Sequence, residues 1–507
     1  MENYVANELG KIKKILIHSP DDGIGKIIPS KFKEWLYDDT VHLQKMRAEY
    51  NEYIQLLLYF IDPDKAEYVQ KHLATHQGEK QFEVFKPDHA NYFNSDKVID
   101  VQKALSDILE QELVKIRLVS AICAIESCHQ QIQQQLEKLK PIQLANALIT
   151  GILPNSEGEK FIFPPVPNLV FTRDIGITIK DHVLLSKSAT QARKRDSLIA
   201  KYIYFYHSSL FANTPENIIE ISEEDDFFLE DESIQKEKMI SIEGGDVMMI
   251  APRHLIVGCS ERTTQSAADA IIHKLFSLPT LKIEKISVVQ IPAVRAQMHI
   301  DTIFTQIKRN AWVMYGGYSQ VVEQQKQAQK RDYTTIFKGK SNQNGNDRLR
   351  VFQFYKPKSA KYIQGQDYFY KEFPSLEDLL VNVSTEDFGM AESSVKIIYS
   401  ANKEFPYDQR EQWTDSCNLL ALQEGLVIGY DRNDKTIAAF ADKKEGLGFT
   451  IIHAQDLIPK LQDGTVNIQD LTDTLILLSS SELSRARGGS HCMSNALFRA
   501  ELKNDEL

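Results

Sequence analysis

The stretch from residue 485 to residue 493, near the C-terminus, combines residue types that could carry out nucleophilic chemistry. It reads Arg-Ala-Arg-Gly-Gly-Ser-His-Cys-Met, so two arginines and two glycines precede Cys492. A cysteine attacks as the thiolate, and nearby positive charge lowers its pKa. The glycines let the backbone turn tightly and let a ligand come close. A buried, inert thiol fits the same residues, because free cysteine is among the most buried residue types.

Acidic residues and a histidine occur in three short motifs elsewhere in the chain. These are Thr172-Arg173-Asp174, Glu243-Gly244-Gly245-Asp246 and Met298-His299-Ile300-Asp301. We expect the first motif to end a strand and the other two to open strands. Residues two apart on a strand share a face, so His299 and Asp301 are predicted to point the same way. Each polar group could instead satisfy only nearby backbone groups.

Taken together, the cysteine, the histidine and the acids suit either a metal site or nucleophilic catalysis on a cation. Imidazole, thiolate and carboxylate groups can all bind metals, but the chain has no CxxC pair. A guanidinium accounts for more of these residues, because its planar fork of donors matches carboxylates that would be costly to bury unpaired. Cys492 would then attack the guanidinium carbon, and His299 would protonate the leaving nitrogen and later activate water.

Three arginines in polar segments around these motifs could hold an anionic end of the same substrate. They are Arg193, Arg262 and Arg487. Surface charge, the usual role of arginine, is the alternative interpretation.

The composition limits the class of protein. Of the 507 residues, 42% are hydrophobic and 25% charged, as in soluble globular proteins. The net charge of -11 argues against a general nucleic-acid binder. The five dispersed cysteines predict a reducing, cytoplasmic location without a disulfide framework. We see neither a signal peptide nor an apolar run of membrane-spanning length, so no membrane partner is expected.

The first third of the chain divides into two segments. Residues 1–63 begin with a predicted strand ended by Ser19-Pro20, and a helical pattern follows over residues 32–59, with a solvated turn at 36–39. Residues 64–155 show helical spacing and no strand-like runs, so we predict an all-helical insertion. Its last helix is expected to start at Pro141 and to end near Gly151.

Residues 156–507 are rich in strands and contain an internal repeat. Each unit has a polar residue, an apolar strand, a turn and a second apolar strand; the first strands are predicted at 168–174, 245–250, 301–306 and 417–422. Such repetition suggests radial units, as in a propeller, whose opening polar residues would converge on one central site. The polar segments near 223–238 and 320–348 are predicted to be solvated loops.

The ordered set of motifs resembles the arginine deiminase family nearly from end to end. The motifs are Asn168 to Asp174, Glu243-Gly244-Gly245-Asp246, Gly258 to Thr263, Met298 to Thr302, Gly429 to Asn433 and Arg487 to Met493, with Glu8 to Lys14 and Leu36 to Asp39 matching as well. The resemblance implies an α/β pentein fold, a five-unit αβ propeller, with the helical insertion at 64–155.

The resemblance also implies a role for each site residue. Cys492 would be the nucleophile that forms an amidino-cysteine intermediate, His299 the general acid and base beside Glu243, and Asp174 and Asp301 the groups that bind the guanidinium. Asn168, Arg193 and Arg262 match positions that bind the α-carboxylate, and Arg487 matches a mobile arginine that contacts substrate. The implied reaction converts L-arginine and water to L-citrulline and ammonia without a metal or organic cofactor. We also expect a homo-oligomer.

Other functions remain open at this point. A related amidinotransferase or dihydrolase could pass the same intermediate to another acceptor, and a non-catalytic arginine-binding protein could keep the pocket. Asn168, Arg193 and Arg262 favour free arginine over agmatine or protein arginine, which offer no free α-carboxylate. The chain is longer than the resemblance leads us to expect, and Cys417 departs from the family pattern as a packed thiol.

Overall fold

One pattern of strand pairing recurs in five sheets of the computed structural model. The structure describes residues 3–155, 158–320, 322, 349–357 and 368–502. Within these residues, each of the five sheets contains an antiparallel pair of strands and a third strand that runs parallel to the second. The strands are β1 (Ile12–Ile17), β2 (Val98–Asp100), β3 (Ile152–Asn155), β4 (Gly158–Phe161), β5 (Gly176–Ile179), β6 (His182–Leu185), β7 (Ile218–Ile219), β8 (Val247–Ala251), β9 (His254–Cys259), β10 (Lys285–Gln290), β11 (Phe304–Lys308), β12 (Ala311–Met314), β13 (Arg350–Tyr355), β14 (Tyr370–Phe373), β15 (Lys396–Tyr399), β16 (Leu420–Gln423), β17 (Leu426–Tyr430), β18 (Thr450–His453), β19 (Thr474–Leu478) and β20 (Asn495–Arg499).

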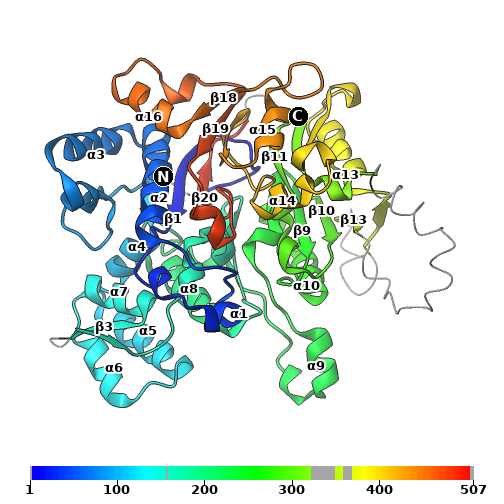
Figure 1. Cartoon of the computed structure of the whole chain (residues 1–507). Helices are drawn as coiled ribbons and strands as arrows, with labels where there is room; N and C mark the ends of the chain where they lie inside the picture. The colour runs from blue at the N-terminus through cyan, green and yellow to red at the C-terminus, as the bar shows by residue number, and fades with distance from the viewer. Residues whose placement is uncertain (1–2, 156–157, 321, 323–348, 358–367, 503–507) are drawn as a thin grey trace, which may run out of the picture.

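The recurring sheets contain, in order, β5-β6-β7, β8-β9-β10, β11-β12-β15, β16-β17-β19 and β20-β1-β2. β13 and β14 extend the second sheet, and β18 extends the fourth. In the fifth sheet, the C-terminal strand β20 pairs with the N-terminal strand β1, and the two lie side by side in Figure 1. The four hairpins predicted from the repeat are therefore present, and a fifth unit joins the two ends of the described chain.

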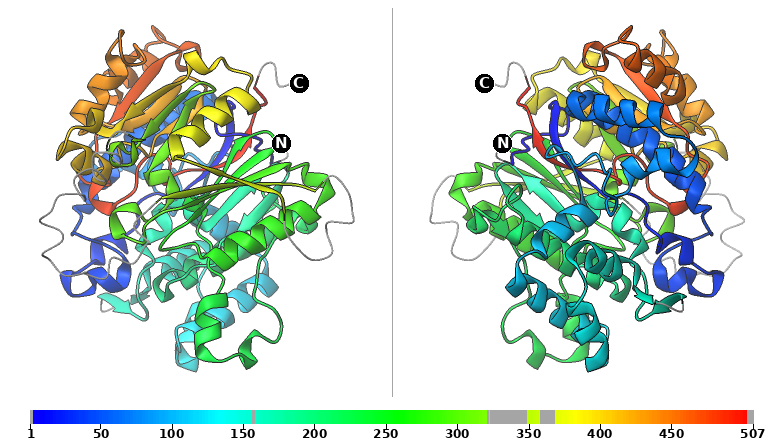
Figure 2. Two further views of the ribbon diagram at one scale, coloured as in Figure 1. Left: turned by 90° about the vertical axis from the view of Figure 1, so that its right-hand side faces the viewer. Right: turned by 90° about the vertical axis from the view of Figure 1, so that its left-hand side faces the viewer.

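The helices lie largely between the second and third strands of these units. Parallel neighbours need a crossover, and a helix is its usual form. Figure 2 shows helices around the outside of the strands. They are α1 (Phe32–Trp35), α2 (Leu43–Ile61), α3 (Pro63–Thr75), α4 (Val101–Ile108), α5 (Glu112–Ile125), α6 (Gln130–Glu137), α7 (Pro141–Thr150), α8 (Lys194–Tyr206), α9 (Glu232–Lys238), α10 (Gln265–Ser277), α13 (Leu376–Asn382), α14 (Tyr407–Trp413), α15 (Asp434–Ala441) and α16 (Ala454–Gln462). No helix among the described residues is long and apolar enough to cross a bilayer.

The first strands begin later than the sequence predicts. Short 3-10 turns precede them at Thr172–Ile175, Gly244–Asp246 and Ile300–Thr302. The polar motifs therefore lie on turns rather than on strands, and the predicted common face for His299 and Asp301 is wrong. The two side chains reach different partners: His299 contacts Glu243, and Asp301 contacts His491.

The predicted all-helical insertion is interrupted by strands. β2 lies inside the 64–155 segment and pairs in parallel with β1, so α2 and α3 form the crossover between them. The helices α4 to α7 follow as a group, at the lower left of Figure 1. The last of them starts with Pro141 at its first position and ends at Gly151, whose φ of 72° is left-handed, as predicted.

Two other predicted segments also differ in detail. The helix expected over 32–59 breaks after Trp35, where Leu36 has a φ of 63°, and resumes at Leu43. The predicted loop at 223–238 contains α9, which projects from the body in Figures 1 and 2. Most of the loop predicted at 320–348 lies outside the described residues.

Gly151 provides a test of how tightly α7 is joined to the next segment. A Cβ there would lie 2.1 Å from the carbonyl oxygen of Phe163. We expect Gly151→Ala to lower the free energy of unfolding by about 2 kcal/mol or more, as judged from urea denaturation followed by circular dichroism. Gly78→Ala is the matched control, because Gly78 also has a positive φ but has no atom within 4 Å of that Cβ. Its cost should be about 1 kcal/mol, and equal costs would contradict the close packing.

Candidate active site

Backbone and side-chain hydrogen bonds join the segments that precede the first strands of all five units. Each link runs from one unit to the next, and together the links close a ring. They are Arg173 Nε to Gly244 O (3.4 Å), Ile300 N to Asp246 Oδ1 (3.0 Å), Asn418 Nδ2 to Asp301 O (3.0 Å), Cys492 N to Asn418 Oδ1 (2.9 Å) and Arg173 N to Cys492 O (3.1 Å). The ring brings residues far apart in sequence to one place, as the repeat predicted.

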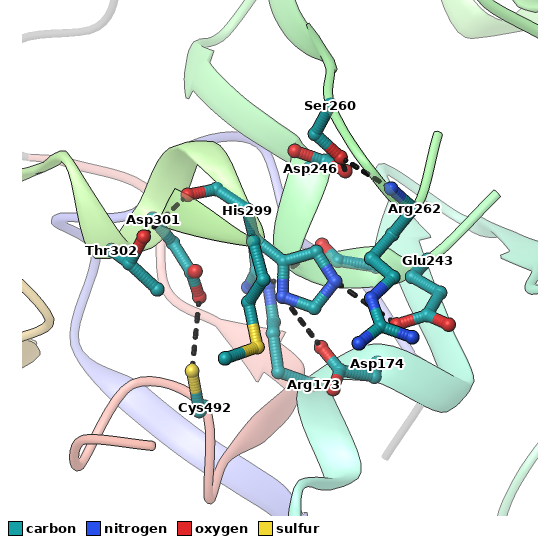
Figure 3. A network of polar contacts seen from close by, with 12 residues as sticks. Arg173, Asp174, Glu243, Asp246, Ser260, Arg262, His299, Asp301, Thr302 and Cys492 are labelled. Atoms are coloured by element: carbon teal, nitrogen blue, oxygen red, sulfur yellow. Dashed lines mark hydrogen bonds and ion pairs between the residues drawn. The ribbon is translucent and has the colours of Figure 1, made fainter. Parts of the chain in front are cut away.

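Cys492 lies in a buried and negatively charged environment. Its thiol donates to Asp301 Oδ2 over 3.5 Å, and Figure 3 shows the two side chains pointing toward each other. The side chain is 4% exposed. Burial and the charges of Asp301, Asp174 and Asp415 raise the pKa of the Cys492 thiol well above its usual range. These effects keep the cysteine as a neutral thiol, and a cation beside it would favour the thiolate.

His299 lies between two carboxylates. Its Nε2 is 3.0 Å from Glu243 Oε2, and its Nδ1 is 3.6 Å from Asp174 Oδ1 (Figure 3). Burial acts to lower the pKa of His299, but the charge of Asp174 and the hydrogen bond with Glu243 outweigh it and raise the pKa to about 9. The imidazole is therefore protonated at neutral pH and can act as an acid first.

Arg193 is bound to the same carboxylates. Its Nη1 is 2.6 Å from Asp174 Oδ2 and 3.2 Å from Glu243 Oε2, and its Nε is 3.2 Å from Asp196 Oδ2. Burial acts to raise the pKa of Glu243, but Arg193 and His299 overcome it and lower the pKa to about 2. The guanidinium of Arg193 therefore contacts Asp174, one of the two carboxylates predicted to bind the guanidinium of a substrate.

Arg262 and Arg487 line the same pocket but are bound differently. Arg262 is 2% exposed, and its Nε donates to no described residue. Arg487 has a left-handed φ of 67°, and its guanidinium carbon lies 3.4 Å from the ring centroid of Trp413. The side-chain amide of Asn168 donates to Trp35 O, and the backbone carbonyl oxygen of Asn168 accepts from Arg193 Nη2 at 3.3 Å.

The pocket is closed by the turn at Leu36 to Asp39. Three arginines pair with its acids: Arg295 and Arg487 with Asp38 at 3.2 and 3.6 Å, and Arg485 with Asp39 at 2.9 Å. The enclosed cavity has a volume of only about 20 Å³. That is room for about one water molecule, so a larger ligand enters only if this cover or a lining side chain moves.

The sequence analysis missed several residues that surround the cysteine and its carboxylates. Asp301 Oδ2 is 2.9 Å from His491 Nδ1, and His491 Nε2 is 3.6 Å from Glu8 Oε2. Glu8 in turn pairs with Arg173 at 2.8 Å. His491 stands beside Cys492 in the printed motif, but its partner Glu8 is nearly 500 positions away, and no local spacing indicates the contact. Arg295 at the pocket wall was missed as well.

The arrangement also satisfies the simplest geometric condition for a metal site. Asp174, Glu243 and His299 each offer an atom within 4.8 Å of the others. The Arg193 guanidinium already hydrogen bonds to both of these carboxylates, so positive charge reaches them from the protein itself.

Known proteins resemble this chain in sequence over almost its whole length. The sequence model of the family described as "Arginine deiminase" matches residues 34–499. The chain is 25% identical to the arginine deiminase of Borreliella burgdorferi over 503 residues, covering 98% of both chains. It is also 25% identical to that of Treponema denticola, covering 98% of this chain and 99% of the other. A solved amidinotransferase from Microseira wollei, of the saxitoxin biosynthetic pathway, is 11% identical, covers 99% of this chain and 98% of its own, and has a TM-score of 0.41.

A site of cysteine, histidine and buried carboxylates, on a mixed α/β chain, defines a class of enzymes that modify guanidino groups. The chain belongs to the arginine deiminase family. The family predicted from the sequence is therefore confirmed, and with it a hydrolytic enzyme class.

The raised pKa of His299 can be tested directly. Replacing Glu243 with glutamine removes one charge at nearly constant shape, so the pKa of His299 should fall by about 1 pH unit or more, as followed by NMR of the ring protons. The stability linked to this ionisation is fully present below the ordinary pKa of 6.5 and is lost as the pH rises through about 9. Glu67→Gln, at a side chain 62% exposed, is the control. An unchanged pKa in Glu243→Gln would contradict the assigned contact.

Proposed function

We propose that the protein hydrolyses L-arginine to L-citrulline and ammonia through a covalent amidino-cysteine intermediate. One observation carries the proposal: Asp174 Oδ1 and Asp301 Oδ1 are buried and accept no hydrogen bond from any described residue. Both carboxylates act on the pKa of Cys492. Buried acceptors without donors are costly, and a guanidinium supplies five N–H donors and a positive charge to such carboxylates.

Binding of a guanidinium would also activate the cysteine. Burial and acidic neighbours hold the Cys492 thiol in its neutral form. A substrate cation placed between the sulfur and these acids offsets part of their negative charge and favours the thiolate. The nucleophile therefore forms when substrate is bound, which limits reactions of the free enzyme with other electrophiles.

His299 supplies the proton transfers in both half-reactions. The thiol proton of Cys492 passes to solvent as the substrate cation binds. Sγ then forms a bond to the guanidinium carbon, and a terminal C–N bond breaks as His299 delivers a proton to the nitrogen that leaves as ammonia. The neutral imidazole then takes one proton from water, whose oxygen attacks the same carbon. The C–S bond breaks, the second proton of that water passes to the departing sulfur, citrulline forms, and the charge of Glu243 keeps His299 protonated for the next cycle.

The arginines around the pocket are assigned to the α-carboxylate of the substrate. Arg262 has a free buried donor for it. Arg193 contacts Asp174, and the substrate guanidinium would replace it there and release it toward the substrate carboxylate, beside Asn168. Arg487, next to the cover at Asp38, would contact the bound substrate as the cover closes.

We further propose a five-unit pentein propeller as the architecture that places these groups. The repeated pairing in five sheets and the ring of hydrogen bonds support it. Residues 1–63 and 156–507 would form the propeller and 64–155 the inserted segment, with β2 linking that segment to the fifth sheet. The five cysteines are free thiols, which fits a reducing cytoplasm.

The direct test is product formation by the purified protein. L-arginine should yield citrulline and ammonia, whereas agmatine and a peptidyl arginine should yield little, because neither offers a free α-carboxylate. Adding glycine should leave the products unchanged. Amidino transfer to glycine, or no turnover of any of the three compounds by folded protein, would overturn the proposal.

Cys492→Ser tests the nucleophile. Turnover should fall by about 10³-fold or more, while calorimetry should still detect arginine binding. Cys128→Ser, at a half-buried cysteine in the helical segment, is the control and should keep its activity. Citrulline release near the unmodified rate from Cys492→Ser would refute the assignment.

Arg262→Ala tests the carboxylate contact. The value of kcat/KM for L-arginine should fall by about 10- to 100-fold, the loss expected for a charged hydrogen bond, while the low activity with agmatine should change little. Arg253→Ala, at an exposed arginine on the turn between β8 and β9, is the control. Equal losses with both substrates would contradict the role.

A further inference from the structure

A second cavity, with a volume of about 570 Å³, lies apart from the candidate active site. Its walls are the turn at residues 19–22, one side of α2, the segment at residues 78–88, and parts of α4 and α7. Figure 1 shows these helices together on the left side of the molecule. None of the lining residues belongs to the pocket around Cys492, and the proposed hydrolysis uses none of them.

Gln102 shows that the cavity presents a polar group without a partner. The residue is only 5% exposed and lies in the cavity wall. Its backbone N–H donates to Asp100 Oδ1 at 2.7 Å, but no hydrogen bond to its side-chain amide occurs among the described residues. A buried amide normally has partners, so this one is available to a ligand in the cavity.

A buried ion cluster lies behind the wall nearest β1, and Asp21 is its member that lines the cavity. His18 is fully buried, with Nε2 3.1 Å from Asp21 Oδ2 and Nδ1 3.6 Å from Asp100 Oδ1. Burial acts to lower the pKa of His18, but the hydrogen bonds with Asp100 and Asp21 outweigh it and raise the pKa to about 9. One imidazolium thus faces two carboxylates, which leaves a net charge of about -1 on this wall at neutral pH.

The remaining charges of that wall cancel. Arg47 Nη2 is 3.0 Å from Asp22 Oδ1, and its Nε donates to Pro20 O at 2.9 Å. Arg47 is therefore already neutralised and is not a site for an anion.

The segment at residues 78–88 forms an acidic and aromatic part of the cavity wall. Glu79 and Asp88 line it with a single cation, Lys86, so it also carries a net charge of about -1. Within the described residues neither acid forms an ion pair. Phe82, which is 40% exposed, and Phe85 add ring surface. Aromatic faces beside carboxylates favour organic cations with an apolar body.

We propose that this cavity is a binding site for an aliphatic di- or polyamine. Its two net negative walls match two cationic ends, the rings match the methylene chain between them, and the Gln102 carbonyl accepts an N–H. The cavity is much larger than a single ion requires. α2 connects it to the candidate active site, because Tyr53 on α2 donates to Ser490 O, two residues from Cys492.

Calorimetry with putrescine tests the proposal, because putrescine has neither the guanidinium nor the carboxylate of the proposed substrate. We expect saturable binding of one putrescine per chain, with no binding of the neutral diol in which hydroxyls replace the amines. Glu79→Gln/Asp88→Asn should weaken binding at least ten-fold, and Glu110→Gln, at an exposed acid outside the cavity, should leave it unchanged. Thermal unfolding of each variant checks that it is folded.

The competing outcomes are distinct. Absence of saturable binding, or equal binding by the double variant, would overturn the proposal. If Asp301→Asn loses putrescine binding and the double variant keeps it, the amine binds in the candidate active site. That result would also overturn the proposal. The measurement needs no turnover, so its failure is independent of any failure to form citrulline.

Discussion

The structure depends on the closed ring of hydrogen bonds between the turns that precede the five first strands. Each turn is short and supplies only one or two functional side chains. Because the links run through backbone groups and through Asp246 and Asn418, the position of each turn is fixed by its neighbours. The reactive geometry is therefore a property of the assembled ring rather than of any one segment, and side chains such as His299 are held with little freedom to rearrange.

Charge balance is the second constraint. Buried carboxylates raise the pKa of both Cys492 and His299: Asp301, Asp174 and Asp415 act on the thiol, and Asp174 and Glu243 act on the imidazole. Arg193 balances part of this charge through its contact with Asp174. The carboxylates that hold the thiol neutral also favour a bound cation, so recognition of a cation and formation of the thiolate are coupled electrostatically.

The sequence was sufficient to predict the hairpins, the end of α7 at Gly151 and the meeting of Cys492 with His299, Glu243, Asp174 and Asp301. These features follow from local periodicity, from turn residues, or from motifs quoted in order. The 3-10 turns were missed because three residues are too few for a periodic pattern. β2 was missed for the same reason, and because its partner β1 is about 80 residues away. The contact of Glu8 with His491 and the pairing of Arg193 with Asp174 depend on tertiary placement, which spacing along the chain does not encode.

The pairing of β20 with β1 has a consequence for biosynthesis. The strand that follows Cys492, β20, is made long after its partner β1. Until they meet, the ring has a gap at the position of Cys492, and the thiol has neither its backbone anchor from Asn418 nor the neighbouring Asp301. A polypeptide that lacks β20 therefore carries no closed ring, and the surroundings of Cys492 are complete only once synthesis has passed β20.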